Sequence, residues 1–341
     1  MHSKILALNP LLFVSKPFRV IMNRFFVVSV TFLLLATSQQ TSAQSDNLKT
    51  WNEVISEYSD TGTLGGVSIS LDSNLTNNSN TMMGDEWPSL IEVYTATWCI
   101  NCVTTQNIID SLSISEEESM MKIHYHRFFA ETQDPFGSQK TDERWIDRYG
   151  PTSRLTTTYE YENIAPSKVF DGERLHTGTT KFSESLEIDY QTSLDKGPSI
   201  DISTLSATLS WTNLSGSNDF SWNISTPSLS DKYTIEPMIF IIEDEAYFPE
   251  GGNGEKYYHH ILRDIIFLSS VAGNISSDFN MAYDGDDISA VLVFDWNYDN
   301  PEDGLLSAIP FPSAVIFVSL FIAIFYPVSY THLTLPTIYS V

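Results

Sequence analysis

The chain has two cysteines in 341 residues, and they lie three positions apart in the segment Trp98-Cys99-Ile100-Asn101-Cys102. Two thiols at this spacing can form a disulfide, exchange it with another disulfide, or supply two ligands of a metal ion. Exchange requires one sulfur that reacts as a thiolate and a second that can displace it from a mixed disulfide. We expect Cys99 to be the nucleophile and Cys102 to be the resolving thiol.

The segments around this pair predict a strand followed at once by a helix. Residues 90–95, LIEVYT, form a short apolar run, and later apolar residues recur at helical spacing, at Val103, Ile108, Ile109 and Leu112. Cys99 would then lie at the helix N-terminus, where free backbone N–H groups and the positive end of the helix dipole stabilise a thiolate. We therefore expect a lowered pKa for Cys99, and a Cys99 side chain more exposed than that of Cys102.

The residues Trp98 to Cys102 after a strand, with Ala165-Pro166 before a hairpin at 167–176, resemble the thioredoxin superfamily over about residues 87–195. The resemblance implies a cis bond before Pro166 that faces the disulfide, an Ala165 backbone that binds extended substrate, and a Trp98 ring that shields the disulfide. The superfamily usually has a buried acid six residues before the first cysteine, where this chain has Val93. The neighbouring Glu92 would point to the other face of the strand. Proton transfer is then either unassisted or handled by another group.

Other interpretations of the cysteine pair stay open. It could be half of a zinc site whose other ligands are scattered His or carboxylate side chains, because the chain has no second CxxC. It could be a structural disulfide, although so short a loop constrains the unfolded chain little. It could carry Cu(I) as a metallochaperone, although no methionine or histidine adjoins the pair. We expect neither a resident metal nor a cofactor.

Histidines and acidic residues outside the pair are weaker candidates. His124 and His126 share one face of a second predicted strand. They could tune the cysteine site, but we expect both to be half-exposed and structural. The remaining candidates are also expected to be structural or solvated rather than metal ligands. They are His259, His260 and Asp264, and the acidic clusters at 243–245 and 284–287.

The composition excludes one class of partner and indicates a folded protein. The chain has 18 basic and 43 acidic side chains, with a formal net charge of −25. A surface of this charge repels nucleic acid, which requires a basic footprint. The apolar fraction of 42% and the aromatic fraction of 13% are typical of a protein that builds a core.

Both ends of the chain carry apolar segments that indicate export and anchoring. We interpret residues 1–43 as a signal peptide, with Met22 as an alternative start, because basic residues precede an apolar run. Residues 305–328 carry no charge and are long enough to span a bilayer as a transmembrane anchor. We interpret residues 329–341 as sequencing-adapter read-through. The expected location is extracytoplasmic, with one membrane helix, where disulfides persist.

The segments between these ends predict two kinds of domain. Residues 44–86 are rich in polar residues and indicate a linker or an edge element. Residues 87–196 alternate strands and helices, as in a thioredoxin-like domain. Residues 198–300 contain short strands parted by polar clusters, which predict an immunoglobulin-like β-sandwich. The expected fold class is an α/β thioredoxin-like domain plus an all-β sandwich domain, with a C-terminal transmembrane helix.

Together these expectations predict a membrane-tethered, extracytoplasmic thiol–disulfide oxidoreductase. Its partners would be protein thiols or disulfides, with a redox partner that the sequence does not identify. The alternative is a cell-surface binding protein in which the sandwich recognises a ligand and the disulfide is static. Fast exchange at Cys99 would favour the first function, and inert, buried sulfurs would favour the second.

Overall fold

The computed structural model describes residues 49–50, 59–72, 74–114, 119–214, 216–279 and 287–298. The predicted signal peptide 1–43, the predicted anchor 305–328 and the segment 329–341 lie outside the described residues. Within the described ranges, no helix is long and apolar enough to cross a membrane.

The described strands form two sheets. The larger has nine strands in the order β1 (Lys49–Thr50), β7 (Arg174–Thr177), β6 (Ser167–Phe170), β4 (Ser89–Thr95), β5 (Met120–His126), β11 (Tyr257–Phe267), β10 (Tyr233–Tyr247), β13 (Ile288–Tyr298) and β2 (Thr61–Ser70). The smaller has four strands in the order β12 (Ala272–Ser276), β9 (Ser217–Ser225), β8 (Ser206–Leu214) and β3 (Asn77–Met83). The described helices are α3 (Ile100–Asp110), α4 (Gln139–Leu155), α5 (Leu186–Lys196) and the short 3₁₀ helix η1 (Gly84–Glu86).

The expected fold class, an α/β thioredoxin-like domain plus an all-β sandwich domain with a C-terminal transmembrane helix, is wrong. The described residues are mostly β, with 44% strand and 19% helix, and they do not show a clear α/β thioredoxin fold. Strands from both predicted regions share the nine-stranded sheet, which continues from β5 into β11 through a parallel pairing of His124 with Ile261. The local residue pattern predicts that a segment is a strand. It does not predict which distant strand will pair with its free edge and accept its backbone hydrogen bonds.

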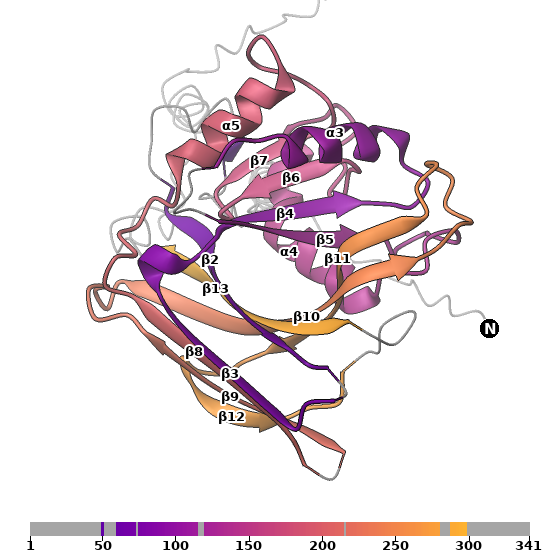
Figure 1. The fold of residues 1–341 in the computed structure, drawn as a ribbon. Helices are drawn as coiled ribbons and strands as arrows, with labels where there is room; N and C mark the ends of the chain where they lie inside the picture. Colours follow the sequence, from indigo (N-terminus) through magenta and orange to yellow (C-terminus); the bar gives the residue numbers. More distant parts are fainter. Residues whose placement is uncertain are drawn as a thin grey trace, which may run out of the picture. The chain divides into compact units, whose positions relative to one another are not determined.

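Helices cover both faces of the part of the large sheet that carries the cysteines. α3 and α5 lie on one face of β4 and β6 (Figure 1), where Val93, Phe170, Ile109 and Tyr190 belong to one buried cluster. α4 lies on the opposite face, where Trp145 and Tyr149 pack against Tyr94 and Tyr125. These two faces alternate along β4, so Glu92 lies on the α4 face, as expected from its neighbour Val93.

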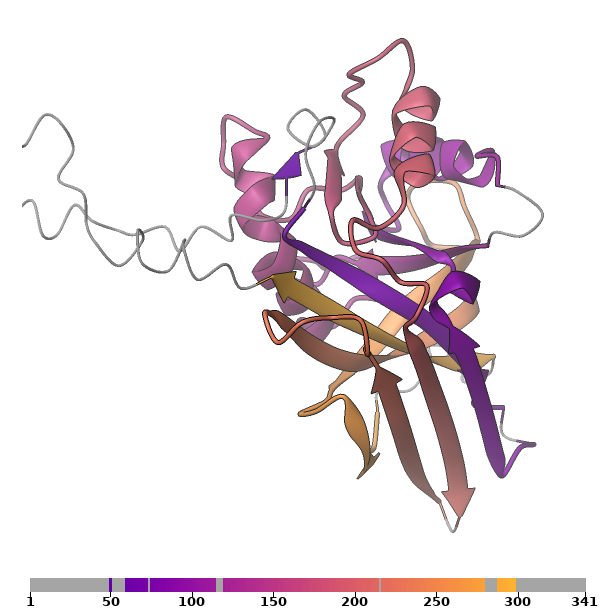
Figure 2. The same cartoon turned by 90° about the vertical axis from the view of Figure 1, so that its left-hand side faces the viewer.

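The remaining part of the large sheet packs against the four-stranded sheet. Figures 1 and 2 show β3, β8 and β9 running across one face of β2, β10 and β13. The buried cluster between the two layers includes residues from both sheets, among them Val67, Ile239, Leu292, Leu209 and Trp211. The large sheet is therefore covered partly by helices and partly by another sheet.

Two local features of the chain show where sequence patterns succeed and fail. The predicted hairpin at 167–176 is confirmed. Its turn residues Asp171 and Gly172 both have positive φ, at 50° and 67°. The pair Gly150-Pro151 predicts a helix end, but α4 continues to Leu155. Thr152 and Ser153 beyond the proline are buried, so tertiary packing outweighs the loss of one helical hydrogen bond.

A buried charge network joins α4 to strands in both parts of the large sheet. Arg144 Nη2 lies 2.8 Å from Asp295 Oδ1 on β13 and 3.9 Å from Glu92 Oε1 on β4. Asp295 also accepts a hydrogen bond of 2.7 Å from Thr63 Oγ1 on β2. Glu92 accepts hydrogen bonds from the Tyr125 and Tyr149 hydroxyls, yet burial raises its pKa and outweighs Arg144, which lowers it.

Asp295→Asn should lower the free energy of unfolding by about 3–5 kcal/mol, because it removes the carboxylate that lies 2.8 Å from the buried Arg144 guanidinium. Urea denaturation followed by tryptophan fluorescence measures the change. The control is Asp231→Asn at an exposed position, which should change the free energy by less than about 0.5 kcal/mol. Equal effects of the two variants would contradict this role of Asp295.

Candidate redox site

Cys99 and Cys102 form a disulfide at the N-terminus of α3, with their Cα atoms 5.3 Å apart. Cys99 is the N-cap residue, and its Sγ accepts a hydrogen bond of 3.2 Å from the Cys102 backbone N–H. A thiolate at this position would receive the same hydrogen bond and would face the positive end of the helix dipole. The strand and helix predicted around the pair are confirmed.

The structure brings the sequence-predicted site residues together. The Ala165-Pro166 peptide bond is cis, and Ala165 packs against the small buried cluster formed by Ala96, Cys99 and Cys102. Trp98 is 36% exposed. The disulfide therefore packs against the segment that enters β6, and a partly exposed tryptophan directly precedes it in the chain.

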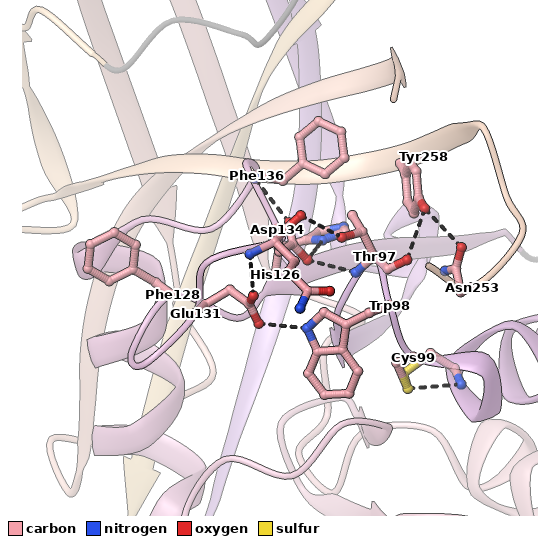
Figure 3. Close-up of polar contacts among 12 residues, drawn as sticks. Thr97, Trp98, Cys99, His126, Phe128, Glu131, Asp134, Phe136, Asn253 and Tyr258 are labelled. Carbon is pink, nitrogen blue, oxygen red and sulfur yellow. Dashed lines mark hydrogen bonds and ion pairs between the residues drawn. A yellow bond between two sulfur atoms is a disulfide. The ribbon is translucent and has the colours of Figure 1, made fainter. Parts of the chain in front are cut away.

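Trp98 is held in place by an acidic residue from the connection after β5. Its Nε1 donates a hydrogen bond of 2.6 Å to Glu131 Oε2 (Figure 3). Burial raises the pKa of Glu131, but hydrogen bonds from Trp98 and from the backbone N–H groups of Gln133 and Thr132 outweigh it and hold this pKa below its usual value. The indole is thus ordered without being buried.

Both cysteines are buried to nearly the same extent. Cys99 is 5% exposed and Cys102 is 4% exposed. The expectation that Cys99 is the more exposed residue of the pair therefore has no support in the disulfide form. A difference in reactivity would have to come from the helix terminus and from neighbouring polar groups.

The connection between β10 and β11 packs against the cysteine segment, which sequence reasoning missed. The Thr97 carbonyl accepts hydrogen bonds from the Asn253 backbone N–H, at 3.0 Å, and from the Tyr258 hydroxyl, at 3.2 Å. A Cβ at Gly251 would lie 2.0 Å from the Tyr258 hydroxyl, so a larger residue would require this hydroxyl to move. The pair Gly251-Gly252 before a strand is the sequence feature that marks a close backbone approach. It does not identify the cysteine segment as the partner in that contact.

An aspartate joins the cysteine segment to a buried histidine. Asp134 Oδ2 accepts a hydrogen bond of 2.8 Å from the Thr97 backbone N–H and lies 2.8 Å from His126 Nδ1 (Figure 3). His126 is 1% exposed and His124 is 8% exposed. The prediction that these histidines are half-exposed is therefore wrong, because β11 and the connection before it cover the end of β5.

A pocket of about 400 Å³ adjoins the disulfide on the side of α3, β5 and β11. Cys102, His124, His126, Asn253 and Tyr258 are among the residues that line it. Burial lowers the pKa of His124 well below its usual value, with the nearby bases His260 and His126 acting in the same direction. His124 is therefore neutral at ordinary pH.

A buried lysine occupies the sheet face beneath α3. Lys168 on β6 pairs with Val93 on β4, so the two side chains share one face. Its Nζ has no hydrogen-bond partner among the described residues, and Lys168 is 1% exposed. Burial lowers the pKa of Lys168 to about 7.

Two candidate metal ligands outside the cysteine pair, His259 and Asp264, contact other polar side chains. Within the described ranges, no three His, Cys, Asp or Glu side chains are placed to hold a metal ion together. His259 instead lies 3.5 Å from Glu245, and Asp264 lies 2.6 Å from Lys140 Nζ, both measured between the paired side-chain atoms.

Comparisons with known proteins do not assign the chain to a family. No family model matches the sequence, and no curated protein matches it. Two solved structures are similar to this chain. A structural-genomics target from Agrobacterium tumefaciens has 11% identity and a TM-score of 0.34, over 60% of this chain and 93% of that one. HBP35 of Porphyromonas gingivalis has 14% identity and a TM-score of 0.31, over 62% of this chain and 65% of that one. Similarity at this level carries no argument about fold or function.

Lys168→Met should raise the free energy of unfolding, and the gain should depend on pH. Between the folded pKa of about 7 and the ordinary value of 10.5 the unfolded chain binds more protons, so wild-type stability rises with pH over this window. The advantage of the variant is therefore largest at and below about pH 7, roughly a few kcal/mol, and it shrinks toward about pH 10.

Chemical denaturation at several pH values measures this difference. The control is Lys256→Met at an exposed position. An advantage of Lys168→Met that stays constant over the same pH range would contradict the lowered pKa.

Proposed function

We propose that the protein exchanges disulfides with protein thiols through Cys99 and Cys102. The observation that carries this proposal is the position of the pair: Cys99 Sγ caps α3 and accepts the Cys102 N–H at 3.2 Å. The same donor and the helix dipole would stabilise a Cys99 thiolate after reduction. The motif resemblance to the thioredoxin superfamily, with Trp98 and Ala165-Pro166 as substrate-binding residues, belongs to this proposal.

The exchange proceeds in two balanced steps. In the dithiol form, the Cys99 thiolate attacks one sulfur of a substrate disulfide, and the other substrate sulfur leaves as a thiolate. Cys102 then attacks Cys99 Sγ, which restores the intramolecular disulfide and releases the second substrate sulfur. The substrate gains two electrons and the cysteine pair loses two. In the opposite direction, a substrate dithiol reduces the pair, and an external thiol or disulfide protein regenerates the starting form.

The cellular location is a separate part of the proposal and rests on the sequence. A signal peptide at 1–43 and an anchor at 305–328 would place the cysteine pair outside the cytoplasm, tethered to the cell membrane. The disulfide at Cys99–Cys102 is compatible with that environment.

A second candidate function is a surface binding protein with a static disulfide. Cysteines that are only 5% and 4% exposed favour it, because a buried disulfide is slow to meet another thiol. In this case the disulfide would stabilise the α3 N-terminus, and the packed sheets would carry the binding function.

Titration of the protein in glutathione and dithiothreitol buffers, followed by alkylation and mass spectrometry, should give a potential between about −120 and −270 mV. That range is typical of catalytic pairs. A pair that stays oxidised below about −300 mV would behave as a structural bond and would favour the second candidate.

The single-cysteine variants test the assignment of roles. Cys102→Ser should accumulate a mixed disulfide with glutathione through Cys99, because the resolving thiol is missing. Cys99→Ser should accumulate much less, because Cys102 lacks the N-cap position. Equal trapping by the two variants would contradict Cys99 as the nucleophile.

A further inference from the structure

A buried imidazole beside the disulfide has one paired nitrogen and one unpaired nitrogen. His126 Nδ1 lies 2.8 Å from Asp134 Oδ2, while Nε2 has no hydrogen-bond partner among the described residues. A carboxylate only accepts hydrogen bonds, so Nδ1 carries a hydrogen, and in the neutral form of the ring Nε2 carries a lone pair. A buried acceptor without a donor is costly to a fold, which suggests that it has a use in another state of the protein.

The orientation of this ring is fixed from three directions. Asp134 accepts further hydrogen bonds from the Thr97 N–H, at 2.8 Å, and from the Phe136 N–H, at 3.0 Å. The His126 ring makes edge contacts with Phe136 and Tyr258, at centroid distances of 5.1 and 5.9 Å (Figure 3). Thr97 is two residues from Cys99, so the aspartate fixes the histidine relative to the cysteine segment.

His126 and Cys102 line the same pocket of about 400 Å³. We propose that His126 accepts the proton of Cys102 when Cys102 resolves a mixed disulfide at Cys99, and that Asp134 positions His126 and stabilises the imidazolium. This inference rests on the proposed exchange reaction. It supplies the group that the chain lacks at Val93, where the motif resemblance implies a buried acid.

The step balances in atoms and electrons. The proton moves from Cys102 Sγ to His126 Nε2, and the electron pair left on the sulfur forms the bond to Cys99 Sγ. The bond between Cys99 and the substrate sulfur breaks, and the substrate leaves as a thiolate. The imidazolium then returns the proton to that thiolate or to water.

Other titratable groups face the same pocket. They are His124 on β5, Asp110 on α3, Glu255 before β11, and Tyr257, Tyr258 and His259 on β11. Lys168 on β6 lies near His124. His124 also has an unpaired Nε2 in the described part of the chain, but no acid pairs with its ring there. Burial, with Asp134 and Glu255 acting in the same direction, raises the pKa of Tyr258 to about 12, so its hydroxyl keeps its proton.

The test isolates Cys102 as the one thiol in a Cys99→Ser background of the full chain. The rate of iodoacetamide alkylation of Cys102 is measured against pH by mass spectrometry. Adding His126→Gln should move the midpoint of this profile upward by about one unit, which lowers the alkylation rate near pH 7 about tenfold. Adding Asp134→Asn, which keeps the imidazole, should shift the midpoint in the same direction by less.

The matched control is His124→Gln in the same background, which should change the rate less than about threefold because the lowered pKa of His124 makes it a poor proton acceptor. Added imidazole should restore alkylation in a His126→Ala variant, an effect that a purely structural role would not produce. An unchanged profile in both His126→Gln and Asp134→Asn would overturn the proposal, and so would an equal shift in His124→Gln. If His126→Gln does not fold, the Asp134→Asn profile decides.

The outcomes of this experiment are independent of the exchange reaction. If the pH profile of Cys102 alkylation depends on His126 but the protein does not exchange disulfides, the proton transfer from Cys102 to His126 is supported and the proposed function is rejected. If the protein exchanges disulfides but substitutions at His126 and Asp134 do not change the pH profile of Cys102 alkylation, this inference alone is rejected.

Discussion

The Arg144 guanidinium links α4 to strands from both parts of the large sheet. It lies 2.8 Å from Asp295 on β13 and 3.9 Å from Glu92 on β4, and all three residues are buried. Moving an ion out of water costs several kcal/mol unless a partner compensates for it. Helix α4 therefore lies where carboxylates from both parts of the sheet reach the guanidinium.

The candidate redox site depends on that arrangement. β4 and α3 place Cys99 at a helix N-terminus, but the polar groups around it come from elsewhere in the chain. Asn253 and Tyr258 bind the Thr97 carbonyl, and Asp134 binds the Thr97 N–H and His126. The cysteine pair is thus part of a short local motif, whereas the groups that surround it come from residues that are distant in the sequence.

Several properties of the site could be predicted from nearby residues. The strand before Cys99, the helix after it, the turn at Asp171-Gly172 and the direction of Glu92 follow from short-range periodicity and turn chemistry. The fold class and the exposure of His124 and His126 were predicted wrongly. Those errors share one cause, because sequence patterns do not identify the strand that covers the open edge of β5.

The sequence by itself determined the local setting of the cysteine pair, since the spacing of Cys99 and Cys102 and the helix that follows them are local properties. The tertiary structure alone decided which groups surround the pair. Thr97 and Tyr258 are separated by 161 positions in the chain. Contacts of that kind depend on which strand edges meet and which charges are buried together, and both are settled by the free energy of the whole fold rather than by any one segment.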